Sequence, residues 1–357
     1  MFSIFTIMRI LLLLLLPIFS FAQNKTVYKN LALEGGGIHG IAYAGAFKIL
    51  EEKGILKNIE KVAGSSAGAI AGVMICLNYS SAEIDSILMS LKFEKMNDGK
   101  GGLIGKYRRV KNKFGLYKGD NFEKWVEEII NEKTGIPNLT FKQLHELHIT
   151  NPIYKDLYCT GTNLSKQKLE IFSYETTPNF SVATAVRISG GIPLYFEPIA
   201  LDDNLMPIKK GDKEAFVNYY VDGGMLCNYP ICMFDTCKNG KDNPLICSDV
   251  KFNNQTLGLK LERSAQIDSF ANNNTAIPYY RPKNIKQYLM AFGNLTMETL
   301  ARRYVGLENE IGRTIYISSG NTDPMIKKMS TESKRNLFSN GEKAVVSFFN
   351  NKESVVL

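Results

Sequence analysis

Histidine is scarce in this chain of 357 residues, with only three, at positions 39, 145 and 148. A triad of the α/β-hydrolase type runs serine, then acid, then histidine along the chain. In that order the histidine follows the acid, but no histidine follows position 148. A triad of this order with its acid in the later part of the chain is therefore excluded. His145 and His148 lie in "FKQLHELHIT", an amphipathic helix pattern in which they are expected to be surface or interface residues.

Metal-binding patterns are also lacking. Four of the six cysteines fall in residues 227–247, without CxxC spacing and without a nearby histidine, so a zinc site is not supported. Residues for a calcium loop are not evident either, and we expect neither metal nor cofactor. The four cysteines at 227–247 are compatible with one or two disulfides in an oxidising compartment. Cys76 and Cys159, in apolar runs, are instead expected to be buried thiols.

Acidic residues are outnumbered, and the formal net charge is +8. This balance favours anionic surfaces, but most basic residues are scattered, and we expect no nucleic-acid partner. The densest group is predicted either to be a solvated face or to touch lipid headgroups. It comprises Lys106, Arg108, Arg109, Lys111 and Lys113.

The one long apolar run lies at the N-terminus. Arg9 precedes a leucine-rich stretch from Ile10, which ends in the small-x-small pattern of Ser20 and Ala22. The run is shorter than the ~20 residues of a membrane span. We therefore predict a signal peptide over residues 1–22 and an exported protein, with an uncleaved N-terminal anchor as the alternative. Cysteine is absent near this site, which argues against a lipoprotein anchor.

The remaining chain, residues 23–357, contains neither an internal repeat nor a low-complexity linker, and it predicts a single domain. A strand at 28–33, a glycine-rich turn and a helix are followed by a second strand at 61–63, turn and helix. This alternation predicts a three-layer α/β/α fold with a mainly parallel central sheet. Further strands are expected at 158–161, 169–172, 216–221 and 314–318. Helices are expected within 80–134, at 181–188 and 285–306, and at the C-terminus.

"GSSAG" matches the G-x-S-x-G nucleophile elbow, with Ser66 at its centre. The strand-to-helix turn is so tight that side chains at Gly64 and Gly68 would clash with the backbone. The serine would then lie at a helix N-terminus, whose dipole favours developing negative charge. The motif alone is common, and a small-residue helix cap is the alternative. Its position between a strand and a helix favours the elbow.

"GGGIHG" has two interpretations. Gly35, Gly37 and Gly40 fit the dinucleotide-binding fingerprint, which also requires an acidic residue at the end of the second strand. That strand ends in the serine elbow instead, so we do not expect a nucleotide. The favoured interpretation is an oxyanion hole built from backbone N–H groups of the loop, whose residues are Gly35, Gly36, Gly37, His39 and Gly40.

A carboxylate is therefore required as the base for Ser66, since His39 is poorly placed for this role. Asp222 is the best candidate, because it ends a strand and is followed by Gly223 and Gly224. Two glycines let the chain turn sharply and leave the carboxylate at the carboxyl edge of the sheet, where ligand sites gather. Alone, Asp-Gly-Gly is more typical of a plain turn.

These motifs in this order resemble the patatin-like phospholipase family, whose pattern is a G-G-G-x-R/K-G loop, a G-x-S-x-G elbow and a D-G-G/A acid. Similar blocks include "AVRISGGIPLYFEPI" and "DGGMLCNYP", so the resemblance covers roughly residues 31–349. It implies a lipid acyl hydrolase of the phospholipase A type. Ser66 would be the nucleophile and Asp222 the proton acceptor, with an acyl-lipid substrate at a membrane surface. A neutral-lipid esterase, a lysophospholipase or a non-catalytic lipid-binding relative are the alternatives. His39 departs from the family's Arg or Lys, which bears on pH dependence and headgroup preference.

Overall fold

The structure is a computed structural model that describes residues 26–208, 216–238, 250–264, 266–267, 281–283, 288, 312–320 and 329–354. The predicted signal peptide, Cys247 and nearly all of the helix expected at 285–306 lie outside these residues. Within the described residues, no helix has the length and apolar character that crossing a bilayer requires.

An eight-stranded sheet forms the centre of the fold, with seven strands in the order β12-β11-β1-β2-β4-β8-β7 and β5 paired with β4. The five strands from β12 to β4 are mutually parallel, whereas β5, β7 and β8 add antiparallel pairings. In chain order the strands are β1 (Asn30–Leu33), β2 (Lys61–Gly64), β4 (Asp156–Asn163), β5 (Lys168–Phe172), β7 (Ile199–Leu201), β8 (Asn218–Asp222), β11 (Thr256–Glu262) and β12 (Thr314–Ser318). The predicted α/β class with a mainly parallel sheet is confirmed.

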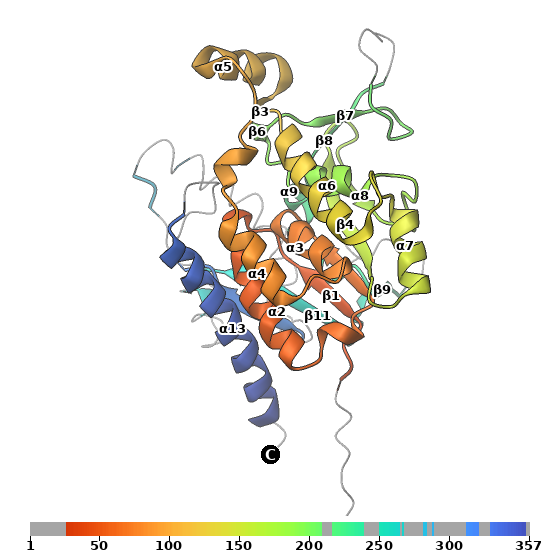
Figure 1. The fold of residues 1–357 in the computed structure, drawn as a ribbon, viewed down its shortest axis with the longest axis vertical. Coiled ribbons are helices and arrows are strands. Elements are labelled where there is room, and N and C mark those ends of the chain that lie inside the picture. The colour runs from red at the N-terminus through yellow and green to blue at the C-terminus, as the bar shows by residue number, and fades with distance from the viewer. Residues whose placement is uncertain are drawn as a thin grey trace, which may run out of the picture.

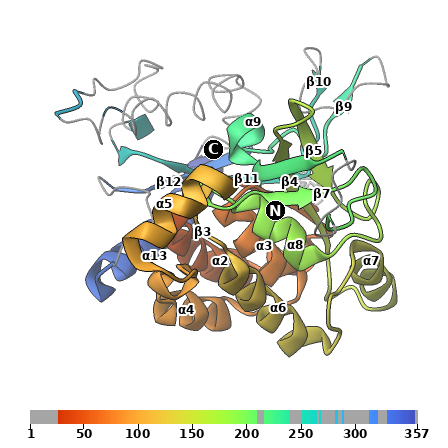
Figure 2. The same ribbon diagram turned by 90° about the horizontal axis from the view of Figure 1, so that it is seen from above.

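Helices flank this sheet. Figure 2 shows α2, α3 and α6 on one face and the short α9 on the other, and α13 packs against α2 and β12 (Figure 1). The α-helices are α2 (Ala42–Glu52), α3 (Ala67–Cys76), α4 (Ser81–Ser90), α5 (Gly102–Lys113), α6 (Asp120–Thr134), α7 (Phe141–Thr150), α8 (Val182–Ser189), α9 (Gly224–Cys227) and α13 (Thr331–Ser354). The 3-10 helices of the described residues are η1 (Gly37–Ile41), η2 (Leu56–Asn58) and η3 (Phe93–Met96). Small separate sheets pair β3 (Gly115–Tyr117) with β6 (Leu194–Phe196) and β9 (Thr236–Cys237) with β10 (Val250–Lys251).

β1 illustrates why a parallel strand is largely apolar, since only Asn30 of its four residues is polar. Its alternate residues Leu31 and Leu33 join the main core beneath the helices, while Ala32 packs on the opposite face with Tyr229 and Ile231. Successive side chains of a strand point to opposite faces, so a strand covered on both sides needs apolar residues at every position. Parallel β1 and β2 then deliver the two glycine-rich turns to the same edge of the sheet.

Most expected elements are present, with small shifts at their ends. The expected strand at 314–318 coincides with β12, and the segment 80–134, where helices were expected, holds α4, α5 and α6. Sequence reasoning missed β11, which pairs with β1 in the middle of the sheet. The sequence signal for this strand is the short apolar run "TLGLKL". Periodicity alone does not distinguish such a run in a buried strand from part of a buried helix.

Candidate active site

Ser66 occupies the sharp turn between β2 and α3. Its backbone has φ 49° and ψ −120°, an unusual conformation for a residue with a side chain. A Cβ at Gly64 would lie 2.4 Å from the carbonyl oxygen of Gly68, and a Cβ at Gly68 would lie 2.2 Å from that of Leu33. Both distances are far below van der Waals contact, so the turn excludes any side chain at these two positions.

The carboxylate of Asp222 lies directly beside this serine. Ser66 Oγ donates a hydrogen bond to Asp222 Oδ2 at 2.8 Å, and the N–H of Gly224 donates to Asp222 Oδ1 at 2.7 Å. Thr162 Oγ1 donates to the Asp222 carbonyl at 2.9 Å, which ties this residue to β4. A Cβ at Gly223 would meet Thr160 Oγ1 at 2.2 Å, so only glycine permits this approach of the turn to β4. The carboxylate is thus held in one orientation.

Burial makes this carboxylate basic. Asp222 is 2% exposed, and desolvation raises its pKa to about 7, against the smaller lowering effects of the Gly224 and Ser66 hydrogen bonds. A general base is most effective when its pKa lies near the operating pH. The geometry therefore combines a hydroxyl, an acceptor at hydrogen-bond distance and a proton affinity suited to neutral pH.

Asp222 lies at the carboxyl edge of the parallel strands although its own strand runs the other way. Strand β8 is antiparallel to β4, so the end of this strand does not by itself bring a residue to that edge. The register supplies the proximity instead. Gly64 pairs with Cys159 and Asp222 pairs with Gly161, which brings the acid just beyond the end of β2, level with the serine turn.

The glycine loop lies against the same turn. A Cβ at Gly35 would fall 3.0 Å from Ser66 Cβ, and one at Gly40 would fall 2.9 Å from Ala67 Cβ. Gly37 has φ 55°, in the left-handed region that favours glycine. Gly35 and Gly40 of the loop therefore pack onto the serine elbow. His39 is buried in η1, the 3-10 helix that leads from the glycine loop into α2.

The backbone N–H groups of this loop are not equivalent. Gly35 N–H donates to the carbonyl oxygen of Asn228 at 2.9 Å, so it is already engaged. Among the described residues, no acceptor is found for the N–H groups of Gly36 and Gly37. These two groups are the available donors for an oxyanion.

Several residues that support the loop were not identified as site residues from the sequence. Asn228 Nδ2 donates to the Gly35 carbonyl at 3.1 Å, and Ser189 Oγ accepts from the Ser66 N–H at 3.0 Å. Both lie in the blocks that carried the family resemblance, which was the available signal. Buried Lys260 bonds Glu34 Oε1 at 3.0 Å and Glu262 Oε2 at 3.2 Å, directly before the loop. This group had no sequence signal, because β11 was not expected.

Two of the histidines are remote from the serine. His145 Nδ1 lies 2.9 Å from Asp156 Oδ1, and its ring stacks on Tyr174 with centroids 3.8 Å apart. Asp156 pairs with Lys61 at the start of β2, whereas the serine turn follows the end of that strand. His148 Nδ1 bonds the Tyr154 carbonyl at 2.7 Å. Both side chains extend from α7 and thus have structural partners at the opposite edge of the sheet.

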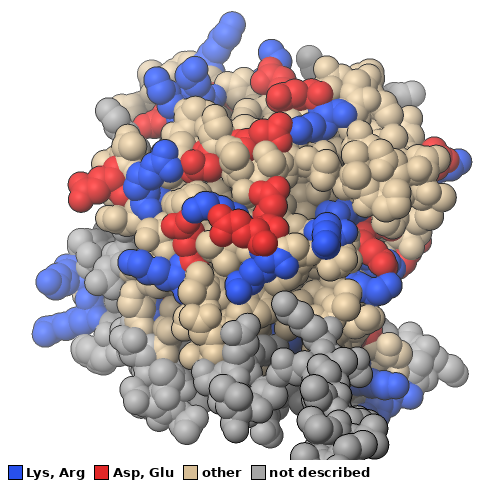
Figure 3. Space-filling view, turned by 60° about the horizontal axis from the view of Figure 1, so that its bottom comes forward, with Lys and Arg blue, Asp and Glu red and all other residues tan. Residues whose placement is uncertain are grey.

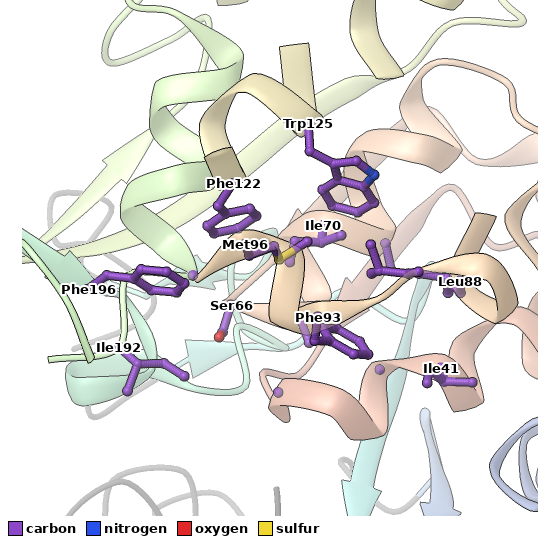
Figure 4. Close-up of a pocket in the computed structure, with 16 residues that line it drawn as sticks. Ile41, Ser66, Ile70, Leu88, Phe93, Met96, Phe122, Trp125, Ile192 and Phe196 are labelled. Atoms are coloured by element: carbon purple, nitrogen blue, oxygen red, sulfur yellow. The ribbon is translucent and has the colours of Figure 1, made fainter. Parts of the chain in front are cut away.

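An apolar cavity opens in front of Ser66. It holds about 610 Å³ of space including its mouth, and Figure 4 shows the serine between Ile192 and Phe196 on one side and Phe93 and Met96 on the other. The rest of the wall is formed by Gly37, Gly40, Ile41, Ala67, Ile70, Ala71, Leu88, Leu91, Phe122, Trp125 and Gly190. No charged side chain among the described residues lines this cavity, so it suits a hydrocarbon chain.

The cysteines show no disulfide among Cys76, Cys159 and Cys227, which are free thiols. Burial raises the pKa of the Cys227 thiol to about 12, which keeps it protonated and unreactive at neutral pH. Within the described residues no group of three His, Cys, Asp or Glu side chains is arranged to hold a metal ion.

The chain is similar to several known proteins. Residues 31–235 match the family described as "Patatin-like phospholipase". The uncharacterized protein R571 of Acanthamoeba polyphaga mimivirus is 31% identical over 266 residues, covering 70% of this chain and 81% of that protein. The probable lipid hydrolase 463L of Invertebrate iridescent virus 6 is 28% identical over 220 residues, covering 60% of this chain and 65% of that protein.

Among solved structures, VipD from Legionella pneumophila superposes with a TM-score of 0.55 at 19% identity, over 91% of this chain and 67% of that one. This similarity concerns the fold. A serine elbow and a glycine loop at one edge of a mainly parallel sheet define the class of α/β serine hydrolases. Within that class, the chain belongs to the patatin-like phospholipase family, whose members are lipid ester hydrolases.

Proposed function

We propose that this protein is a lipid acyl hydrolase of the phospholipase A type, which cleaves fatty-acyl esters of phospholipids at a membrane surface. The observation that supports it is the hydrogen bond of 2.8 Å between Ser66 Oγ and Asp222 Oδ2 at the base of an apolar cavity. The cavity takes the acyl chain and leaves the headgroup outside.

In the first half-reaction Asp222 accepts the proton of Ser66 while the serine oxygen bonds to the ester carbonyl carbon. The carbonyl oxygen becomes negatively charged and is held by the N–H groups of Gly36 and Gly37. Collapse of this intermediate breaks the ester bond, and the proton on Asp222 passes to the leaving alcohol, a lysophospholipid. The fatty acid remains bound to Ser66 as an ester.

In the second half-reaction Asp222 accepts a proton from water, whose oxygen attacks the acyl-serine carbonyl. The fatty acid leaves, and Ser66 regains its proton from Asp222. The pKa of about 7 allows this carboxylate to accept and return protons at neutral pH. A single carboxylate thus serves both halves of the reaction.

The test is substitution of each dyad member. Asp222→Asn should lower kcat for p-nitrophenyl butyrate and for phospholipid by about 10²–10⁴-fold, the usual contribution of a general base. Ser66→Ala should abolish both activities and labelling by a fluorophosphonate. Ser65→Ala is the matched control, because that buried hydroxyl has no hydrogen-bond partner among the described residues. Full activity in Ser66→Ala or Asp222→Asn would refute the dyad.

Products released from mixed vesicles define the substrate. Free fatty acid with lysophospholipid supports phospholipase A activity, whereas release from triacylglycerol or lysophospholipid alone would identify the neutral-lipid or lysophospholipid alternatives. Absence of fluorophosphonate labelling would identify a lipid-binding relative without catalysis.

We further propose that the protein is exported, with residues 1–22 as its leader. Fractionation of expressing cells, followed by N-terminal sequencing of the exported chain, tests this. A mature N-terminus at Gln23 is expected, and an intact N-terminus in the membrane fraction would indicate the anchor instead.

A further inference from the structure

Helix α5 exposes the apolar residues that a surface helix normally packs against the core. It projects from the body next to β3 (Figure 1), and none of its residues is buried. Leu103 is 85% exposed, Ile104 69% and Tyr107 68%. A surface helix normally turns its apolar stripe toward the core. Here the stripe faces away from the protein.

Polar side chains, and not the apolar stripe, attach α5 to the body of the protein. Lys106 Nζ lies 2.9 Å from Tyr117 Oη, and Arg109 donates to the carbonyls of Leu116 at 3.0 Å and Lys100 at 2.8 Å. Side chains at i and i+3 or i+4 share one helical face, so the exposed Leu103, Ile104 and Tyr107 lie together as an outer stripe. The contacts therefore fix the orientation in which this stripe is exposed.

The charged residues within α5 all have one sign. α5 contains five Lys or Arg residues and neither Asp nor Glu. Arg108 and Lys111 are exposed and form no ion pair within the described part of the chain. Figure 3 shows acidic and basic side chains intermingled over the face in view. The basic helix thus differs from that face.

The helix is joined to the rim of the cavity at both ends. The preceding η3 contributes Phe93 and Met96 to the cavity wall, and β3, which follows α5, pairs with β6. β6 supplies Phe196 to the wall and exposes Leu194, whose side chain is 65% exposed. A surface that α5 contacts would therefore lie beside the entrance to Ser66.

We propose that α5 is an interfacial docking helix, which buries its outer apolar stripe in a bilayer containing anionic phospholipid and holds the cavity mouth against it. A basic amphipathic helix with exposed apolar residues lies in the plane of a membrane, with its cations at the headgroups. This proposal rests on the proposed lipid hydrolase function for its purpose, but not for its test.

The experiment places a tryptophan on the stripe. Tyr107→Trp is made in the full chain carrying Ser66→Ala, which prevents any hydrolysis of the vesicles. Emission is compared with that of the same protein lacking the new tryptophan, to subtract Trp125. Vesicles of phosphatidylcholine with phosphatidylserine, with and without brominated acyl chains, are then added. Bromine quenches a tryptophan only at close range, so the readout is local to α5.

Quenching of Tyr107→Trp by brominated vesicles is expected. Ile149→Trp on α7 is the matched control, because Ile149 is also 68% exposed, and it should not be quenched. Arg108→Gln with Lys111→Gln should weaken binding to the anionic vesicles on the order of 30-fold, from the usual contribution of two cations near an anionic membrane. Lys124→Gln with Lys142→Gln provides a charge-matched control on α6 and α7.

Three outcomes overturn the proposal: no quenching at position 107, equal quenching at position 149, or equal affinity in the two double charge variants. The first of these, together with capture of a protein partner by α5, would identify the stripe as a protein-binding surface. Hydrolysis of soluble p-nitrophenyl butyrate by the two charge variants with Ser66 intact is measured separately. If docking fails and hydrolysis is retained, the docking proposal is wrong and the proposed function is unaffected. If docking occurs without hydrolysis, the proposed function is wrong and the docking proposal is unaffected.

Discussion

Ser66 Oγ lies 2.8 Å from Asp222 Oδ2, although 156 positions separate the two residues along the chain. The serine comes from the turn between β2 and α3, and the acid from the end of an antiparallel strand two places away in the sheet. Burial of both side chains keeps water from competing for the hydrogen bond. Four predictions follow from this arrangement and the cavity around it.

The pH dependence of hydrolysis should report Asp222. The carboxylate must be unprotonated to act as a base, and its pKa is about 7, so kcat/KM should fall tenfold per pH unit below about pH 7. A pH-stat assay with p-nitrophenyl butyrate measures this. His39→Gln should retain the same acidic limb, and disappearance of the limb in that variant would assign it to His39 instead.

Asp222→Asn should stabilise the protein at alkaline pH. The pKa of Asp222 rises on folding from 3.8 to about 7, so the folded state favours the protonated form. The stability associated with that proton is present below about pH 4 and is lost as pH rises through 7. Asparagine avoids this loss, which is at most on the order of 4 kcal/mol.

Urea unfolding at pH 4 and pH 8 checks this second prediction. The variant should exceed the wild type at pH 8 and approach it at pH 4. Asp203→Asn is a control of opposite sign, because hydrogen bonding to exposed Lys166 lowers the pKa of Asp203. If Asp222→Asn is less stable to urea than the wild type at pH 8, the carboxylate stabilises the fold and the prediction is wrong.

Gly68→Ala should prevent formation of the elbow. Its Cβ would lie 2.2 Å from the Leu33 carbonyl oxygen, and the backbone of β1 cannot move without disturbing the sheet. We expect loss of activity with a large drop in Tm. Gly135→Ala provides the comparison, since nothing lies within 4 Å of its Cβ and only its φ of +64° is unfavourable. That variant should lose about 1 kcal/mol and keep its activity.

Enlarging a residue of the cavity wall should shorten the preferred acyl chain. Met96→Trp places a larger ring in the space in front of Ser66, while Met96→Leu conserves volume. Each displaced pair of methylenes should lower kcat/KM roughly 15-fold, from about 0.8 kcal/mol per CH₂. The measurement is a series of p-nitrophenyl esters from butyrate to palmitate. An equal loss for butyrate and palmitate would show that the cavity does not hold the chain.

Local motifs made much of this site predictable. The elbow needs glycine at two positions four residues apart, and the clash that enforces this at Gly64 is with the backbone of its own turn. The loop before η1 and the acid after a strand were recognisable for the same reason. Their order along the chain and the scarcity of histidine were sufficient to select Ser66 and Asp222 as candidates.

Other features required the fold. The antiparallel direction of β8, the engagement of the Gly35 N–H by Asn228 and the buried Lys260 between two glutamates all join distant segments. The cavity wall likewise draws on η1, α3, α4, η3, α6 and the segment around β6. Strand direction and partner choice depend on which surfaces meet, and an isolated segment carries no unique record of them.

The sequence by itself therefore determined the chemistry of this protein: a serine in a glycine-flanked turn, a carboxylate followed by glycines, and no histidine in the position of a triad. Those determinants are steric and local. Only the tertiary structure decided that Asp222 is buried enough for its pKa to reach about 7, and that the serine faces an apolar cavity. It also decided that the stripe of α5 is exposed, because desolvation and exposure depend on everything packed around a side chain.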